Sequence, residues 1–85
     1  MCWTYILRSE KNGRYYIGAA KDVEIREAQH NSGKVRSTKH LRPWKVVYRE
    51  SFSNFVEARR RETYLKSQKS RKAIEGLLKT VSSNA

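Results

Sequence analysis

The Asn12-Gly13 dipeptide constrains this chain more than any other feature, because it lies between two segments with the composition of strands. Residues 3–8 and 14–20 are rich in aromatic and β-branched side chains. Asn-Gly is a strong hairpin signal, since both central residues of a type I′ turn need a positive φ. A two-residue turn pairs positions whose numbers sum to 25, which places Tyr5 on the same sheet face as Tyr16. A longer loop with an even shift would bring the tyrosines closer without changing that face.

The next part of the chain predicts a helix, a connection and a third strand. Asp22 is a suitable N-cap for a helix that ends near Asn31, and Gly33 suits its C-terminal stop. Residues 33–44 form a polar, basic connection, and residues 45–52 have the composition of a strand.

Two helices are expected after the third strand. Asn54 and Glu57 form a capping box for a helix that runs to about Ser67. Ser70 can cap a shorter helix that ends near Lys79. The resulting order is β-β-α-β-α-α, an α+β fold in which a small three-stranded sheet is covered by helices on at least one face, since a hairpin alone is only marginally stable.

The length of 85 residues limits the chain to a small fold with a modest core. We expect one monomeric domain over residues 1–80 and a disordered tail over 81–85. The single cysteine, Cys2, excludes an internal disulfide, and no Cys/His set has zinc spacing. No apolar run approaches the roughly 20 residues that span a bilayer, and no signal-peptide segment occurs. We therefore expect a cytoplasmic protein without a membrane partner.

The net charge of +11 is distributed unevenly along the chain. Residues 33–49 hold six basic side chains and no acidic one, whereas residues 1–32 are nearly neutral. This distribution favours a face that binds a polyanion such as DNA, and the alternative is a solvated basic loop. The candidate nucleic-acid contacts of this stretch are Lys34, Arg36, Lys39, His40 and Arg42.

Arg26 and His30 lie four residues apart on the first predicted helix and so share a face. Arginine holds phosphate oxygens in a bidentate fork, and histidine can position or deprotonate a water near neutral pH. A plain solvated helix face is the alternative. Tyr5 and Tyr16 could orient a water beside Arg26, although most strand tyrosines only pack. Gly18 suggests a close approach of neighbouring groups to the strand.

Glu62 interrupts an apolar stripe on the second helix, which Phe55, Ala58 and Leu65 otherwise form. A carboxylate that faces a core is costly unless it is paired or holds a cation. One interpretation is a ligand for a hard divalent ion such as Mg²⁺, which often takes only one or two protein carboxylates. The other is an ion pair with one of the many arginines, Arg26 included.

Together these residues resemble the GIY-YIG nuclease domain, in particular the small stand-alone bacterial proteins related to the nuclease domain of the excinuclease C subunit. The resemblance covers Trp3 to about Lys79. Tyr16-Ile17-Gly18 matches the second motif literally, while Tyr5-Ile6-Leu7 matches the first loosely, with Thr4 in place of its glycine. Further segments that resemble the family are 22–34, 42–44 and 57–62.

The resemblance implies a three-stranded antiparallel sheet and metal-dependent hydrolysis of DNA phosphodiesters, with Mg²⁺ or Mn²⁺ as a single ion. It implies that Tyr5 and Tyr16 line the site and that one of them helps to activate water. Arg26 would stabilise charge on the phosphate, His30 would assist the phosphate or the nucleophile, and Glu62 would hold the metal. Such an enzyme is expected to be structure-selective and linked to DNA repair or recombination, with specificity from a protein partner.

The chain also departs from the family pattern. Glu27 stands where an apolar residue is usual, and its charge lies beside Arg26 in sequence. The asparagine that some relatives carry after the metal glutamate is absent, and only Gln68 and Ser70 stand in that region. These departures keep two alternatives open: a non-catalytic basic module with the same fold that binds nucleic acid, and a protein-interaction adaptor.

Overall fold

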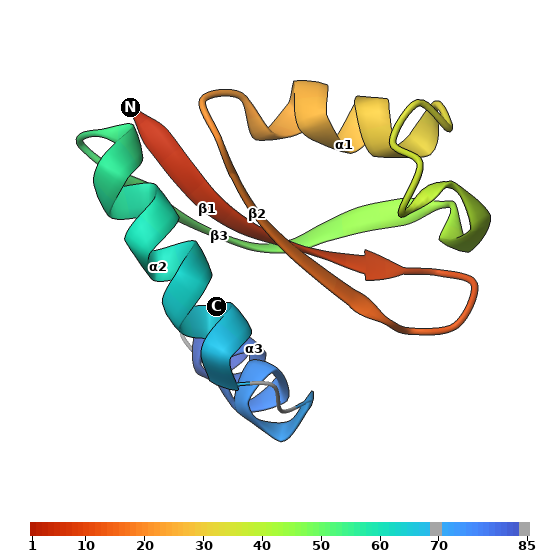
Figure 1. The fold of residues 1–85 in the computed structure, drawn as a ribbon. Coiled ribbons are helices and arrows are strands. Elements are labelled where there is room, and N and C mark those ends of the chain that lie inside the picture. The colour runs from red at the N-terminus through yellow and green to blue at the C-terminus, as the bar shows by residue number, and fades with distance from the viewer. Residues whose placement is uncertain (69–70, 84–85) are drawn as a thin grey trace.

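The computed structural model describes residues 1–68 and 71–83, and it shows a three-stranded sheet with helices against both faces (Figure 1). The elements are β1 (Cys2–Ser9), β2 (Tyr15–Ala20), α1 (Val23–Asn31), a 3-10 helix η1 (Lys39–Leu41), β3 (Trp44–Phe52), α2 (Phe55–Gln68) and α3 (Arg71–Ser83). β1 is central and runs antiparallel to both β2 and β3. The α+β class and the order β-β-α-β-α-α are confirmed.

The hairpin has the predicted shared face but a different turn. Opposed residues of β1 and β2 have numbers that sum to 23, so the two-residue turn predicted from the sequence is wrong. The Ser9 amide donates to the Arg14 carbonyl and closes a loop over residues 10–13. The Ser9 hydroxyl accepts from the backbone N–H groups of Lys11 and Asn12, and Gly13 has a φ of 77°. The serine therefore stabilises a wider loop than the dipeptide alone predicts.

The predicted helix starts are built by the residues that the sequence indicates. The Asp22 side chain accepts a hydrogen bond from the amide of Ile25 and caps α1, and Gly33 follows the helix with a φ of 84°. The Asn54 side chain accepts from the amide of Glu57 and caps α2. Each cap satisfies an amide that the first helical turn leaves without a partner.

The last helix is longer than predicted. α3 continues to Ser83, four residues beyond the expected end at Lys79, and so enters the segment 81–85. Ser70, the predicted cap of this helix, lies outside the described residues, as do residues 84 and 85. The disordered tail stays a prediction.

The two faces of the sheet carry separate apolar clusters, because alternate residues of a strand point to opposite sides. On one face α1 and the segment before β3 pack on the sheet, and the buried residues are Tyr5, Leu7, Ala20, Val23 and Trp44. On the other face α2 and α3 pack around Ile6, Ile17 and Leu65. Within the described part of the chain, no helix has the length and apolar character needed to cross a bilayer.

α1 also binds the backbone of the edge strand β3. The Glu27 carboxylate accepts a hydrogen bond from the amide of Val46, and the Asn31 side chain bonds both backbone groups of Trp44. An edge strand otherwise presents unpaired backbone groups. Glu27 thus fixes α1 to the sheet, which explains why a charged residue occupies an apolar position of this helix.

Candidate active site

The side chain of Tyr5 lies across the space that a side chain at Gly18 would occupy. These two residues are directly opposed in the β1–β2 ladder. A Cβ atom at Gly18 would lie 2.5 Å from the Tyr5 hydroxyl oxygen and 2.7 Å from its Cζ. Glycine is therefore required for Tyr5 to occupy this position, as the strand glycine suggests in the sequence. The ring of Tyr16 is 6.4 Å from that of Tyr5, centroid to centroid.

Arg26 of α1 reaches the two tyrosines. Its guanidinium interacts with the hydroxyls of both Tyr5 and Tyr16, and the hydrogen bond to Tyr5 is the main reason that the pKa of Arg26 is raised. Burial raises the pKa of the Tyr5 hydroxyl, and Arg26 offsets part of that rise. A hydrogen bond from Arg26 to Gln29, 2.7 Å long, further orients the guanidinium. The result is a fixed cation beside two phenol groups.

His30 lies against Tyr16, with the ring centroids 4.6 Å apart, and is fully buried. Its Nδ1 is 2.9 Å from the Thr38 hydroxyl oxygen, and that oxygen also lies 3.3 Å from the carbonyl oxygen of Val35. Thr38 therefore holds the His30 ring through Nδ1. The other ring nitrogen, Nε2, is buried and has no hydrogen-bond partner among the described residues.

Neutral His30 predicts a pH dependence of stability. Burial first, and then the Arg26 charge, lower the pKa of His30 from 6.5. As the pH falls below about 6.5, the unfolded chain takes up a proton that the folded chain does not, so the free energy of unfolding should decrease. Urea unfolding at several pH values between about 5.5 and 7.5, around the ordinary histidine pKa, measures this slope.

His40 supplies the matched control, because it is exposed on η1. The His30→Gln variant should have a flatter dependence of unfolding free energy on pH, whereas His40→Gln should keep the wild-type slope. The slope is the relevant quantity, since replacement of a buried residue also changes the absolute stability. An unchanged slope in His30→Gln would show that this residue is not held neutral by the fold.

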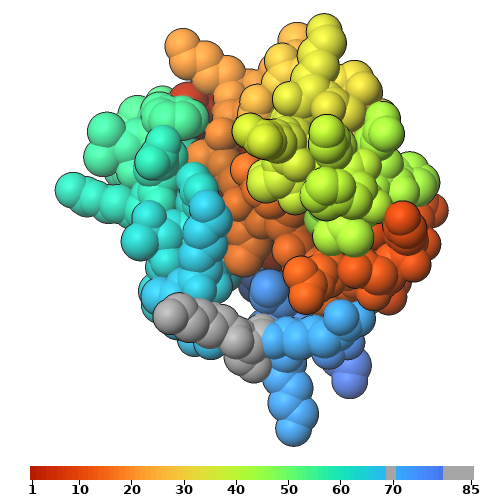
Figure 2. All heavy atoms as spheres, turned by 45° about the vertical axis from the view of Figure 1, so that its right-hand side comes forward, coloured from red at the N-terminus to blue at the C-terminus, as the bar shows by residue number. Residues whose placement is uncertain are grey.

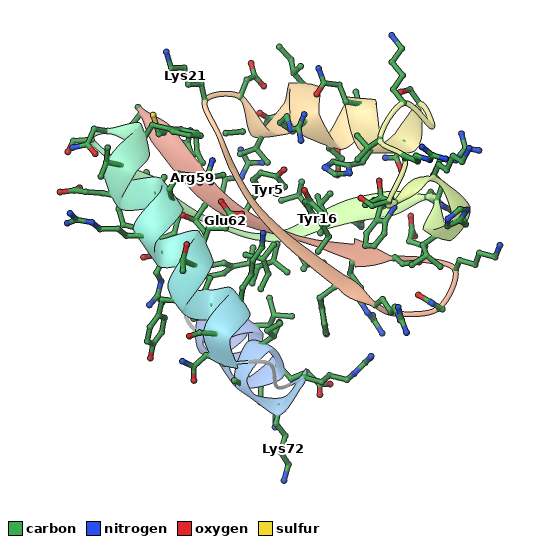
Figure 3. The ribbon with its side chains drawn as sticks, in the orientation of Figure 1. Tyr5, Tyr16, Lys21, Arg59, Glu62 and Lys72 are labelled. Atoms are coloured by element: carbon green, nitrogen blue, oxygen red, sulfur yellow. The ribbon has the colours of Figure 1, made fainter. Side chains whose placement is uncertain are left out.

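Glu62 of α2 completes the cluster from the opposite side (Figure 3). Its side chain is only 14% exposed, and its charge acts on the Tyr5 hydroxyl. Ala58 and Leu65 of the predicted stripe are buried, whereas Phe55 is exposed. Glu62 forms ion pairs within its own helix, at 2.6 Å with Lys66 and 3.5 Å with Arg59.

The ion pairs of Glu62 bear on the second interpretation of this residue. An arginine partner is present, but it is Arg59 rather than Arg26. The partners Arg59 and Lys66 are more than half exposed and can move into solvent, where such pairs contribute little. No group of three or more His, Cys, Asp or Glu side chains gathers anywhere among residues 1–68 and 71–83. The donor set therefore fits a hard ion held by one carboxylate, waters and a phosphate, and it does not fit a cage of protein ligands.

The basic stretch lies apart from this cluster, between α1 and β3. All five predicted nucleic-acid contacts are exposed: Lys34, Arg36, Lys39, His40 and Arg42. Lys39, His40 and Arg42 line a hollow of about 500 Å³, together with Lys11 and Asn31. The stretch therefore forms an exposed surface that is rich in basic side chains.

The structure also shows roles that the sequence did not reveal. Thr38, within the basic connection, holds His30. Lys66 and Arg59 form ion pairs with Glu62. Their positions in the sequence, four residues after and three residues before Glu62, could have predicted these pairs. Gln68, one of the two residues considered in place of the missing asparagine, lines a separate hollow between α2 and α3. The other, Ser70, lies outside the described residues.

Comparison with known proteins identifies the family of the chain. Residues 1–75 match the model of the GIY-YIG catalytic domain. A UPF0213 protein of Staphylococcus epidermidis is 39% identical over 79 residues, which cover 87% of this chain and 95% of the relative. A UPF0213 protein of Listeria welshimeri is 42% identical over 63 residues, 73% of this chain and 69% of the relative.

A solved structure is also similar. The solution NMR structure of a UPF0213 protein from Bacillus halodurans superposes with a TM-score of 0.59 at 33% identity, covering 94% of this chain and 85% of the other. The family match includes both tyrosine strands, the helix that carries Arg26 and the helix that carries Glu62. The chain therefore belongs to the GIY-YIG family of nuclease domains.

Proposed function

We propose that the protein is a metal-dependent endonuclease that hydrolyses phosphodiester bonds in DNA. The observation that supports this proposal most is that the Arg26 guanidinium and the Glu62 carboxylate, from helices on opposite faces of the sheet, both act electrostatically on the Tyr5 hydroxyl. A phosphate needs a fixed cation, and the leaving oxygen needs a Lewis acid or a proton donor.

Each residue of the candidate site has a distinct task in this proposal. Arg26 binds non-bridging phosphate oxygens and stabilises the charge that they gain in the transition state. Tyr5 orients the guanidinium through its hydroxyl, and burial raises the pKa of that hydroxyl, so Tyr5 does not serve as the base. Tyr16 is only half-buried, so its hydroxyl is the better placed of the two to contact the attacking water. His30 is fully buried and supports the Tyr16 ring from within the fold.

Glu62 would hold the divalent ion, Mg²⁺ or Mn²⁺, with waters and a substrate phosphate as its other ligands. When bound, such an ion stabilises negative charge on phosphate and leaving oxygens. Lys66 and Arg59 would release the carboxylate at that moment. Both side chains are exposed enough to turn towards DNA phosphates instead.

The experiment is an incubation of the purified protein with labelled nicked, flapped, branched, single-stranded and blunt duplex DNA. Mg²⁺, Mn²⁺ or EDTA is added to parallel samples. The proposal expects cut products from at least one DNA structure with metal and none with EDTA. Absence of cleavage for every DNA structure with both metals would contradict it.

The same samples test the second candidate, a binding module without catalysis. The high charge of the chain and the exposed basic stretch favour tight DNA binding in either case. A pure binding module would bind equally with metal and with EDTA, and its affinity would fall steeply with salt. Metal-dependent cleavage excludes this candidate, because DNA binding alone breaks no bond.

A further inference from the structure

A groove on the α2–α3 side of the molecule adjoins the candidate active site through Tyr16. It has a volume of about 420 Å³ and opens between β2 and the two C-terminal helices. Figure 2 shows the hollow where β2 (orange) meets α2 (cyan) and α3 (blue). Tyr16 belongs to both the site and the groove, and Lys66 lines the groove while it pairs with Glu62. A DNA strand at Arg26 and Glu62 would therefore continue into this groove.

The groove combines positive charge with an aromatic wall. Three cationic side chains line it, from the hairpin loop, α2 and α3: Arg14, Lys66 and Arg71. No acidic side chain is among its described lining residues. The Arg71 guanidinium lies 5.3 Å from the ring centroid of Tyr15, and its only described acidic neighbour, Glu75, is 3.8 Å away. Arg14 has no carboxylate partner within the part of the chain that the structure describes.

The remaining lining residues are apolar: Ile17, Leu65 and Ile74. An apolar floor with a tyrosine and an arginine suits the flat face of a base, which is exposed only when the nucleotide is unpaired. A duplex, in contrast, presents its phosphates and keeps its bases stacked inside. The basic residues Lys39, His40 and Arg42 around η1 lack such a floor and suit a phosphate backbone alone.

We propose that this groove binds an unpaired nucleotide of the DNA strand that enters the active site. The chain then acts on DNA with a single-stranded segment beside the scissile bond, such as a flap. The base lies against Tyr15, while Arg14 and Arg71 bind the adjoining phosphates. This inference rests on the proposed nuclease function for the identity of the ligand, but its test requires no cleavage.

The test measures fluorescence anisotropy of labelled single-stranded, flapped and blunt duplex DNA in EDTA, over a series of salt concentrations. Wild-type protein should bind the single-stranded and flapped DNA more tightly than the duplex. Tyr15→Leu should weaken single-strand binding by about 5- to 100-fold, the range for loss of one base–aromatic stack. Arg14→Gln and Arg71→Gln should each reduce the salt slope for single strands by about 0.7, the value for one phosphate contact.

Two matched variants serve as controls. Lys72→Gln removes a charge next to Arg71 from a side chain that points away from the sheet (Figure 3). Tyr64→Leu removes a tyrosine that also stacks with an arginine, Arg61 at 5.3 Å, but lines a different hollow. Both should bind single strands like the wild type. Circular dichroism and thermal unfolding check that each variant is folded.

Equal affinity of the wild type for single strands and duplex would overturn the proposal, as would Arg14→Gln and Arg71→Gln variants with an unchanged salt slope. These two arginines are exposed, so their replacement tests the groove even if Tyr15→Leu fails to fold. A protein that binds through the groove but cuts no DNA would support the groove assignment and contradict only the nuclease proposal.

Discussion

Replacement of Arg26 by glutamine is expected to slow DNA cleavage by about 10²- to 10³-fold, the cost of removing one donor that stabilises transition-state charge. Arg26 is the cation that the fold fixes between two tyrosine hydroxyls, and its charge is present at every working pH. Single-turnover cleavage at saturating DNA measures the effect. The loss should appear in the rate of the chemical step, because the basic surface elsewhere still supplies DNA affinity.

Two other variants define the cause of that loss. Arg26→Lys keeps a positive charge but lacks the planar fork, so its rate should lie between those of wild type and Arg26→Gln. Arg60→Gln removes an exposed arginine of α2 and should cleave at the wild-type rate. Wild-type activity in Arg26→Gln would show that Arg26 does not contact the reacting phosphate.

Gly18→Ala is expected to disrupt the site through Tyr5. The added methyl would lie 2.5 Å from the Tyr5 hydroxyl oxygen, and Tyr5 is 1% exposed and cannot turn away freely. Overpacking of this kind costs about 1–3 kcal/mol. In a domain of this length each 1 kcal/mol lowers the melting temperature by about 4–8 °C. Cleavage should also fall sharply, because displacement of Tyr5 releases Arg26.

The glycines of the chain provide their own control. Gly76→Ala adds a methyl that would meet no atom of the described residues within 4 Å apart from the local helix backbone, in a helix where alanine is favoured over glycine by about 0.5–1 kcal/mol. Its melting temperature should be unchanged or slightly higher. The cost of Gly18→Ala should be smaller in a Tyr5→Phe background, because phenylalanine lacks the atom that the new methyl would meet first. Equal costs in both backgrounds would contradict this explanation.

The local signals in the sequence predicted most of the fold, because each depends on only a few neighbouring residues. Asp22 and Asn54 cap the helices that they were expected to cap, and Gly33 ends α1. The prediction of a two-residue turn at Asn12-Gly13 was wrong because a contact with a distant part of the chain sets the length of the loop. The Ser9 hydroxyl, which also donates to the carbonyl of Leu41, stabilises a longer loop that the dipeptide cannot reveal.

The candidate site was predictable only in part. The sequence could place Tyr5 and Tyr16 on one face, and family resemblance pointed to Arg26, His30 and Glu62. The sequence could not show that the Glu27 carboxylate bonds β3 and not Arg26, since the direction of this side chain depends on how α1 packs against the sheet. The groove lined by Arg14, Tyr15 and Arg71 was also hidden, because its walls come from opposite ends of the chain.

The most direct measurement compares wild-type protein and Glu62→Gln in single-turnover cleavage of a labelled flapped DNA with Mg²⁺. Glutamine keeps the shape of the side chain but removes the charge that would hold a divalent ion. The wild type should cut the DNA, whereas Glu62→Gln should bind it with similar affinity and leave it intact. Equal cleavage by the two proteins, or no Mg²⁺-dependent cleavage by the wild type, would contradict the assignment of this site as a metal-dependent nuclease.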